Sequence, residues 1–143
     1  MEALRALSVK QPWAHAIVHL GKDVENRTRC NSHRGLLLIH ASASMTPDYY
    51  AEAGGFIDRV RSRLGIIPRL PRPSLIERGG IVGIVEVVDC VHESSSPWWM
   101  GPRGLVLRNA RPLPFIPCKG TVTPLFWIPD ADVQGKVAEA LRA

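Results

Sequence analysis

The chain has 143 residues, 45% of them hydrophobic, which matches one ordinary domain with a buried core over residues 1–143. No apolar run approaches the roughly 20 residues that cross a bilayer, and the N-terminus lacks the apolar stretch of a secretory signal, so we expect a cytoplasmic protein that does not engage membranes. The net charge of +5 favours a polyanionic partner.

The first elements expected along the chain are a strand over residues 4–9 and a helix over residues 12–20. Proline suits the first helical position and glycine suits the position just past the end, as found at Pro12 and Gly21. The helical period places Trp13 on the apolar face, toward the core. The helix therefore separates two polar segments, one before it and one after it.

These two polar segments carry the strongest functional signal. Lys10 and Gln11 precede the helix, and Lys22 follows it and leads into a predicted strand over residues 23–29. Side chains alternate along a strand, so Glu25 and Arg27 point to the same side. We expect Lys22, Glu25 and Arg27 to face a cleft between the helix and the sheet. The alternative is a surface hairpin whose charges are solvated and paired with one another.

The remaining elements are mostly strands, which predicts an α+β fold built on a small β-barrel or strongly bent sheet of about five to six strands flanked by short helices. Thr46 and Pro47 have the residue types of a helix cap and a first helical position. The further strands are expected at residues 34–41, 80–90, 104–114 and 121–128, and the further helices at residues 46–64 and from Asp130 to the C-terminus.

Two polar residues fall within these apolar strands. Glu86 lies between Ile84 and Val88, where an unpaired carboxylate is costly, so we expect it to be buried and paired with a basic residue. Whether it serves a site or only anchors the hairpin is open. His40 ends the apolar run of the strand at 34–41, and it is either a satisfied core residue or part of a binding site.

Residues 59–78 hold six arginines and one carboxylate, Glu77, and are interrupted by prolines and a glycine. This pattern predicts a helix end followed by a long loop. The arginines either form a solvated face, contact phosphates or bind a protein partner. They are Arg59, Arg61, Arg63, Arg69, Arg72 and Arg78.

Other common chemistry is not indicated. Cys30, Cys90 and Cys118 are far apart and odd in number, which predicts reduced thiols. His15 and His19 have the spacing of a zinc-binding helix, but the intervening glutamate and a third ligand are lacking, so we expect solvent-facing histidines and no metal. There is no phosphate-binding glycine loop or dinucleotide fingerprint, and we expect no cofactor.

The two polar segments resemble a known family signature. Leu-Ser-x-x-Gln-Pro-Trp at residues 7–13, followed by Gly-Lys-x-x-Glu-x-Arg at residues 21–27, is similar to the pattern of the ASCH domain, a member of the PUA-like superfamily. Further segments resemble successive parts of this family, so the match covers nearly the whole chain. They are residues 34–42, 83–87, 99–102 and 120–129.

The resemblance implies a PUA-like barrel and a module that binds RNA, either single-stranded or modified, in a basic cleft beside the barrel. Lysine and arginine would hold phosphates, glutamine would contact a base edge or sugar, and tryptophan would stack on unpaired bases. The expected binding residues are Lys10, Gln11, Trp13, Lys22, Arg27, His40, Trp99 and Arg103.

A second reading is a small hydrolase, since some ASCH relatives are amidohydrolases that act on an acylated cytidine nucleoside and others are linked to ribonuclease activity. The amidohydrolases use a lysine that matches Lys22 and a threonine three residues later. That position holds Glu25 here, so the hydroxyl nucleophile is missing, and the catalytic residues would be Lys22, Glu25 and Glu86.

A third option is a protein-interaction domain that uses the arginine segment.

Overall fold

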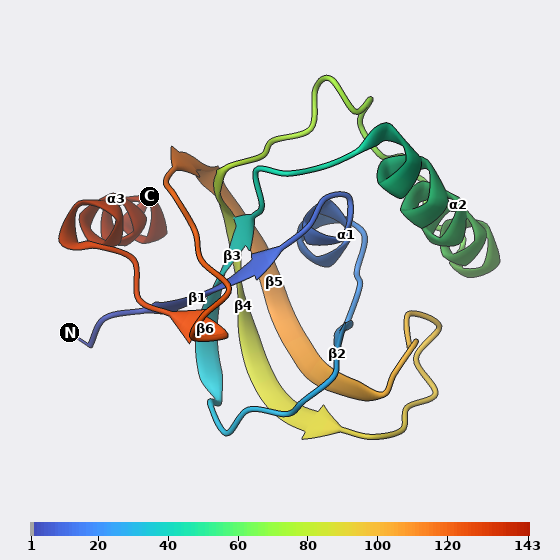
Figure 1. The fold of residues 1–143 in the computed structure, drawn as a ribbon, viewed down its shortest axis with the longest axis horizontal. Helices are drawn as coiled ribbons and strands as arrows, with labels where there is room; N and C mark the ends of the chain where they lie inside the picture. The colour runs from blue at the N-terminus through green and yellow to red at the C-terminus, as the bar shows by residue number, and fades with distance from the viewer. Residues whose placement is uncertain (1) are drawn as a thin grey trace.

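The computed structural model describes residues 2–143 and shows one six-stranded sheet with three helices. The strand order is β2-β5-β4-β3-β1-β6, and the sheet curls into a half-barrel (Figure 1). The described helices fall short of the length and apolar character that a membrane span requires. The elements are β1 (Arg5–Val9), α1 (Trp13–His19), β2 (Val24–Arg27), β3 (Gly35–Ala41), α2 (Pro47–Leu64), β4 (Gly80–Val91), β5 (Arg103–Pro117), β6 (Phe126–Trp127) and α3 (Ala131–Arg142).

The predicted fold class and the predicted order of elements are confirmed. One prediction was too long: the strand expected at residues 121–128 is reduced to Phe126–Trp127. Residues 118–125 instead form an irregular loop, in which the Thr121 hydroxyl donates to the carbonyl oxygen of Thr123 and the peptide bond before Pro124 is cis. The loop passes close to β1, because the Ser8 hydroxyl donates to the Thr121 carbonyl oxygen.

The helix α1 packs directly on the sheet because β4 has a glycine beneath it. A Cβ atom at Gly83 would lie 2.6 Å from Cγ2 of Val18 and 2.9 Å from the Arg111 carbonyl oxygen, so a larger residue would push the helix away. Val18 and Ile17 are buried against the strands. This close packing sets the position of both ends of α1, where the polar segments lie.

The helix α2 lies beyond α1, at the opposite end of the molecule from α3 (Figure 1). The Thr46 side chain accepts a hydrogen bond from the Tyr49 amide, and Gly65 ends the helix in the left-handed conformation with φ of 69°. The arginine segment therefore has the predicted form of a helix end followed by a loop. Arg61 folds back onto this loop and donates to the carbonyl oxygens of Ile67 and Pro68.

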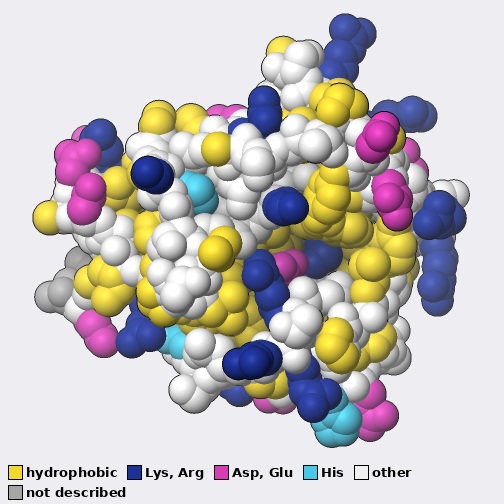
Figure 2. Space-filling model, viewed as in Figure 1, with side chains coloured by type: hydrophobic (Ala, Val, Ile, Leu, Met, Phe, Trp, Pro, Cys, Tyr) yellow, Lys and Arg dark blue, Asp and Glu magenta, His cyan; other side chains and the backbone are white. Residues whose placement is uncertain are grey.

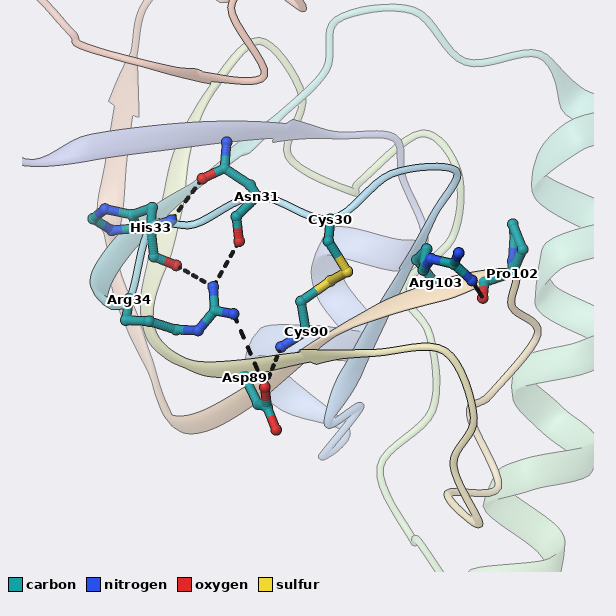
Figure 3. The surroundings of a disulfide bond; sticks show 8 residues. All are labelled: Cys30, Asn31, His33, Arg34, Asp89, Cys90, Pro102 and Arg103. Carbon is teal, nitrogen blue, oxygen red and sulfur yellow. Dashed lines mark hydrogen bonds and ion pairs between the residues drawn. A yellow bond between two sulfur atoms is a disulfide. The ribbon is translucent and has the colours of Figure 1, made fainter.

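The prediction of three reduced thiols is wrong, because Cys30 and Cys90 form a disulfide and Cys118 alone is free. The disulfide joins the segment after β2 to the end of β4, two strands that are separated by β5 in the sheet (Figure 3). Arg34 lies nearby, with its Nη2 atom 3.9 Å from Oδ1 of Asp89. The strand order therefore brings together two cysteines that are 60 residues apart.

The prediction that Glu86 is buried and paired is also wrong. Glu86 is half-buried, and none of the ion pairs within residues 2–143 includes it. Its neighbours across the sheet are Leu36 and Arg108, and both are exposed. Glu86 lies on the same face of β4 as Ile84, as the alternation predicts. Ile84 packs with Val133 and Val137 of α3, but this cover does not extend to Glu86, so the carboxylate reaches solvent.

Candidate functional site

A pocket of about 640 Å³ lies between α1, β2, the start of α2 and the turn at residues 100–102. We call it the Lys22 pocket, after the lysine that lines it. Figure 2 shows a hollow near the middle of this face, in which acidic and basic side chains lie among hydrophobic ones. The cleft predicted for Lys22, Glu25 and Arg27 is confirmed, since all three line this pocket.

The floor of the pocket is a charged trio centred on Glu25. The two oxygens of Glu25 each accept a hydrogen bond, one from Lys22 Nζ at 3.0 Å and one from Arg27 Nε at 2.9 Å. Lys22 is only 3% exposed and Glu25 only 7%. A charge buried this deeply needs a partner. Glu25 therefore holds Lys22 and Arg27 in place, with each of its oxygens already accepting a hydrogen bond from a cation.

Local backbone geometry delivers Lys22 to this trio. Gly21 ends α1 in the left-handed conformation with φ of 77°, and the Lys22 amide bonds to the Ala16 carbonyl oxygen at 3.1 Å. The Lys22 side chain then passes beneath Trp13, with Nζ 5.5 Å from the centre of its ring. Its Nζ also donates to the Val24 carbonyl oxygen, so the ammonium group is held by several neighbours.

Lys10, which follows β1, and Tyr49, in the first turn of α2, form another wall of the pocket. Lys10 is exposed, and its Nζ lies 5.0 Å from the centre of the Tyr49 ring. The Tyr49 hydroxyl accepts a hydrogen bond from Trp13 Nε1 at 3.1 Å. Sequence reasoning missed Tyr49, although the cap at Thr46 places it in the first turn of α2. It supplies the exposed aromatic ring of the pocket.

Asn26 shapes the remaining wall, and the sequence analysis did not single it out. Its Oδ1 accepts hydrogen bonds from the amides of Met100 at 2.8 Å and Gly101 at 3.1 Å, and its Nδ2 donates to the Trp98 carbonyl oxygen. The turn at residues 100–102, which closes the pocket, is thus tied to β2. Asn26 is a positioning residue, and a single asparagine on a strand gives no sequence signal for that role.

Several predicted binding residues lie elsewhere. Gln11 is 2% exposed and supports α1: its Oε1 accepts from the His15 amide, and its Nε2 donates to the Glu77 carbonyl oxygen. The buried Gln11 side chain is therefore not available to a base edge. Trp99 packs against Gly101 and Gly104 rather than lining the pocket. Glu86 and Arg103 also do not line the pocket, and His40 lies in an adjoining one.

The two histidines of α1 are not both solvent-facing as expected. The His15 and His19 rings stack with their centres 4.5 Å apart, and His15 is half-buried. Burial, with charge repulsion from His19, lowers the pKa of His15 to about 4. Across residues 2–143, no group of three or more histidine, cysteine or acidic side chains is placed to hold a metal ion.

Comparisons with known proteins agree with this fold. The model of the ASCH domain matches residues 7–104, more than half of the chain. The ASCH protein of Zymomonas mobilis is similar in structure, with a TM-score of 0.53 and 11% identity over 96% of this chain and 94% of that one. A point mutant of an ASCH protein from the same organism has a TM-score of 0.57 and 13% identity over 96% and 98% of the two chains. Curated protein sequences yield no match.

Proposed function

The chain belongs to the ASCH domain family, and we propose that it binds single-stranded RNA in the Lys22 pocket. The observation that carries this proposal is the charge of the pocket. Three basic side chains, Lys10, Lys22 and Arg27, line it with one carboxylate, Glu25, which two of them already share. The remaining positive charge favours an anion, and phosphates are the anions that nucleic acids supply.

The aromatic side chains favour an unpaired strand over a duplex. Tyr49 is 36% exposed and Lys10 Nζ lies over one face of its ring, so a base that stacks on the other face brings its phosphate near the lysine. In a duplex both faces of each base are already stacked. Trp13 lines the same pocket, but its ring packs against Phe56 and Lys22, so it shapes the pocket more than it offers a free face.

The arginine segment contributes less to this pocket than its charge suggests. Arg59 lines a smaller neighbouring pocket together with Trp13 and Tyr49, so it extends the basic surface from the Lys22 pocket. The other five arginines do not line the Lys22 pocket. A protein partner for residues 59–78 remains a separate proposal, and it predicts that binding of RNA survives substitution of Arg72.

A hydrolase needs a free general base beside its substrate, and the pocket offers less support for it. Glu86 lies outside the pocket, so of the three catalytic candidates only Lys22 and Glu25 line it, and they bond to each other. We therefore place binding before hydrolysis. Incubation of the protein with RNA and with an acylated cytidine tests for the two hydrolytic activities, and release of fragments or of the acyl group would replace the binding proposal.

The binding test uses a fluorescein-labelled single-stranded RNA of about eight nucleotides, a length within the range covered by small binding domains. Fluorescence anisotropy is measured at several salt concentrations, with a duplex of the same sequence as comparison. Affinity should fall with salt, with a slope of about 0.7 per phosphate contact for a single strand. Lys10→Ala should lower the affinity, and it should reduce the salt slope by the value of about one phosphate contact. Lys10 is exposed, so its loss leaves the trio intact.

Two further variants separate charge from stacking. Tyr49→Leu should weaken binding without changing the salt slope, because stacking carries no net charge. Lys136→Ala is the matched control, since Lys136 is an exposed lysine of α3 paired with Asp132. Binding that is insensitive to salt, equal for duplex and single strand, or reduced as much by Lys136→Ala as by Lys10→Ala would contradict the proposal.

A further inference from the structure

A second pocket, of about 610 Å³, adjoins the first and has no assigned role. We call it the His40 pocket. Ser8, Ser42 and Val122 line both pockets, so the two are continuous across β1. We propose that the His40 pocket binds a second nucleotide of the same single strand, so that the smallest full ligand is a dinucleotide. This proposal rests on the proposed binding of RNA in the Lys22 pocket.

The charge of the His40 pocket suits the same ligand. Lys119 lines it, and no carboxylate does, among residues 2–143. Lys119 is exposed, so its ammonium group is available to a phosphate that lies between the two bases. Volumes of about 640 and 610 Å³ both fall in the range of small-ligand sites, roughly 300 to 1,000 Å³. Two pockets of similar volume, each lined by at least one basic side chain and sharing the wall formed by Ser8, Ser42 and Val122, match a repeating polymer better than one small molecule.

The imidazole ring of His40 lies at the edge of this pocket, and its Nδ1 atom is a hydrogen-bond acceptor. His40 is 3% exposed, and its Nε2 lies 2.8 Å from the Cys118 carbonyl oxygen. A carbonyl oxygen only accepts, so Nε2 carries the proton and Nδ1 presents a lone pair. The nearest donor group is the Ser8 hydroxyl at 3.5 Å, and its single proton points to the Thr121 carbonyl oxygen at 2.8 Å.

Nδ1 therefore has only a long contact, at 3.5 Å, with a hydroxyl whose proton is already donated to another acceptor. Gly120 keeps this edge free of side chains: a Cβ atom there would lie 2.6 Å from Nδ1 of His40 and 2.9 Å from Ser8 Oγ. A base N–H group at this edge supplies a stronger donor to Nδ1 than the Ser8 hydroxyl does. Each of the four RNA bases carries such a group, so this contact favours a base without selecting among them.

The same contacts favour binding over catalysis in this pocket. The Ser8 hydroxyl donates to Thr121 rather than to His40, so His40 does not activate it as a nucleophile. The free thiol of Cys118 also lines the pocket, but burial raises its pKa, so it stays protonated at neutral pH. The pocket holds two nucleophile types and activates neither.

The test measures the affinity of adenosine monophosphate and of the dinucleotide ApA by calorimetry, with the full chain. ApA should bind roughly tenfold tighter, which is within the contribution of one stacked base. The variant Ala43→Trp fills the His40 pocket without touching the Lys22 pocket, because Ala43 lines only the former of the two. It should remove the tenfold gain for ApA and leave the affinity for the mononucleotide unchanged.

Matched controls keep the outcome clear. Ala131→Trp places the same bulk at an exposed site on α3 and should change neither affinity. Lys119→Ala alters an exposed side chain, so it should fold normally and lower the affinity for ApA only. Equal affinities for mononucleotide and dinucleotide would overturn the second subsite while leaving the Lys22 pocket in place. Absence of binding by both ligands and by the longer RNA would overturn this inference together with the proposed function.

Discussion

The two pockets share Ser8 as a wall and differ in how their buried polar side chains are paired. The Lys22 pocket is built on full charges, with Glu25 between Lys22 and Arg27. The His40 pocket is built on neutral hydrogen bonds, in which Trp127 Nε1 donates to Ser8 Oγ and Ser8 donates to Thr121. Burial also lowers the pKa of His40 and keeps it neutral.

This difference in pairing predicts that the two pockets respond differently to substitution. Removing one member of a buried charged group leaves an uncompensated charge, and the penalty is large. Removing one member of a neutral network leaves an unmet hydrogen bond, and the penalty is smaller. The charged pocket should therefore be fragile but fixed in its geometry, whereas the neutral pocket should be tolerant of substitution and sensitive to acid.

The largest effect is expected for Glu25→Gln. The substitution leaves Lys22 buried without a counter-ion, which should lower the free energy of unfolding by about 3–5 kcal/mol. Urea denaturation measures this change. Asp132→Asn is the control, because it breaks the exposed pair with Lys136 and should cost at most about 0.5 kcal/mol. If the two variants are equally stable, the trio does not hold the charged pocket together.

The next largest effect concerns the strand that carries the trio. β2 lies at the edge of the sheet with β5 as its one strand partner, and the Cys30–Cys90 disulfide ties the segment after it covalently to β4. Replacing both cysteines by serine should cost about 2–4 kcal/mol, the usual range for closing a long loop. Chemical denaturation with and without a dithiol reductant measures it. Cys118→Ser should leave the reductant effect unchanged, and a wild-type protein that is indifferent to reductant would contradict the prediction.

The charged pocket was largely predictable from sequence, because its members lie close together in the chain. Residues 21–27 combine a helix end with one short strand, so local rules place Lys22, Glu25 and Arg27 on one side. Tyr49 and Met100 reach the same pocket from α2 and from the turn after Trp99, and only the tertiary fold shows this. The sequence therefore predicts the floor of the pocket and Lys10, but not the walls that distant segments supply.

The wrong predictions also concern residues whose surroundings are set by the tertiary fold. The pairing of Cys30 with Cys90 depends on the order β2-β5-β4, which the sequence does not reveal. Glu86 was expected to be buried because its strand neighbours are apolar, but α3 covers that face at Ile84 and not at Glu86, and the sequence does not reveal how far the helix reaches. Gln11 was taken for a ligand contact because its polar side chain precedes a helix, yet it supports that helix by bonding to the His15 amide.

Acid should destabilise the protein through two half-buried or buried histidines, His15 of α1 and His40 of the neutral pocket. The pKa of His15 is lowered to about 4 and the pKa of His40 is also lowered, so the unfolded chain binds protons that the folded chain does not. The stability is therefore complete above the unfolded histidine pKa of about 6.5 and falls as the pH drops toward 4. Unfolding curves at several pH values measure the fall. His40→Gln and His15→Gln should each flatten it, and an unchanged slope in both variants would contradict this assignment.

The smallest effect, and the sharpest separation of the two pockets, is expected for Ser8→Ala. Its hydroxyl serves the His40 pocket, whereas its backbone carbonyl oxygen accepts a hydrogen bond from Arg27 Nη2 at 3.0 Å and is unaffected by the substitution. Trp127 Nε1 loses its acceptor, so the free energy of unfolding should fall by about 1 kcal/mol.

Binding of a mononucleotide in the Lys22 pocket should be unchanged by Ser8→Ala, since the charged trio and its contact with β1 persist. Calorimetric titration beside urea denaturation gives both quantities from one preparation. Ser42→Ala is the matched control: Ser42 also lines both pockets, and its backbone amide bonds to the Val9 carbonyl oxygen independently of the side chain. A loss of mononucleotide affinity in Ser8→Ala but not in Ser42→Ala would show that the two pockets share more than a wall, because the neutral network would then be supporting the charged one.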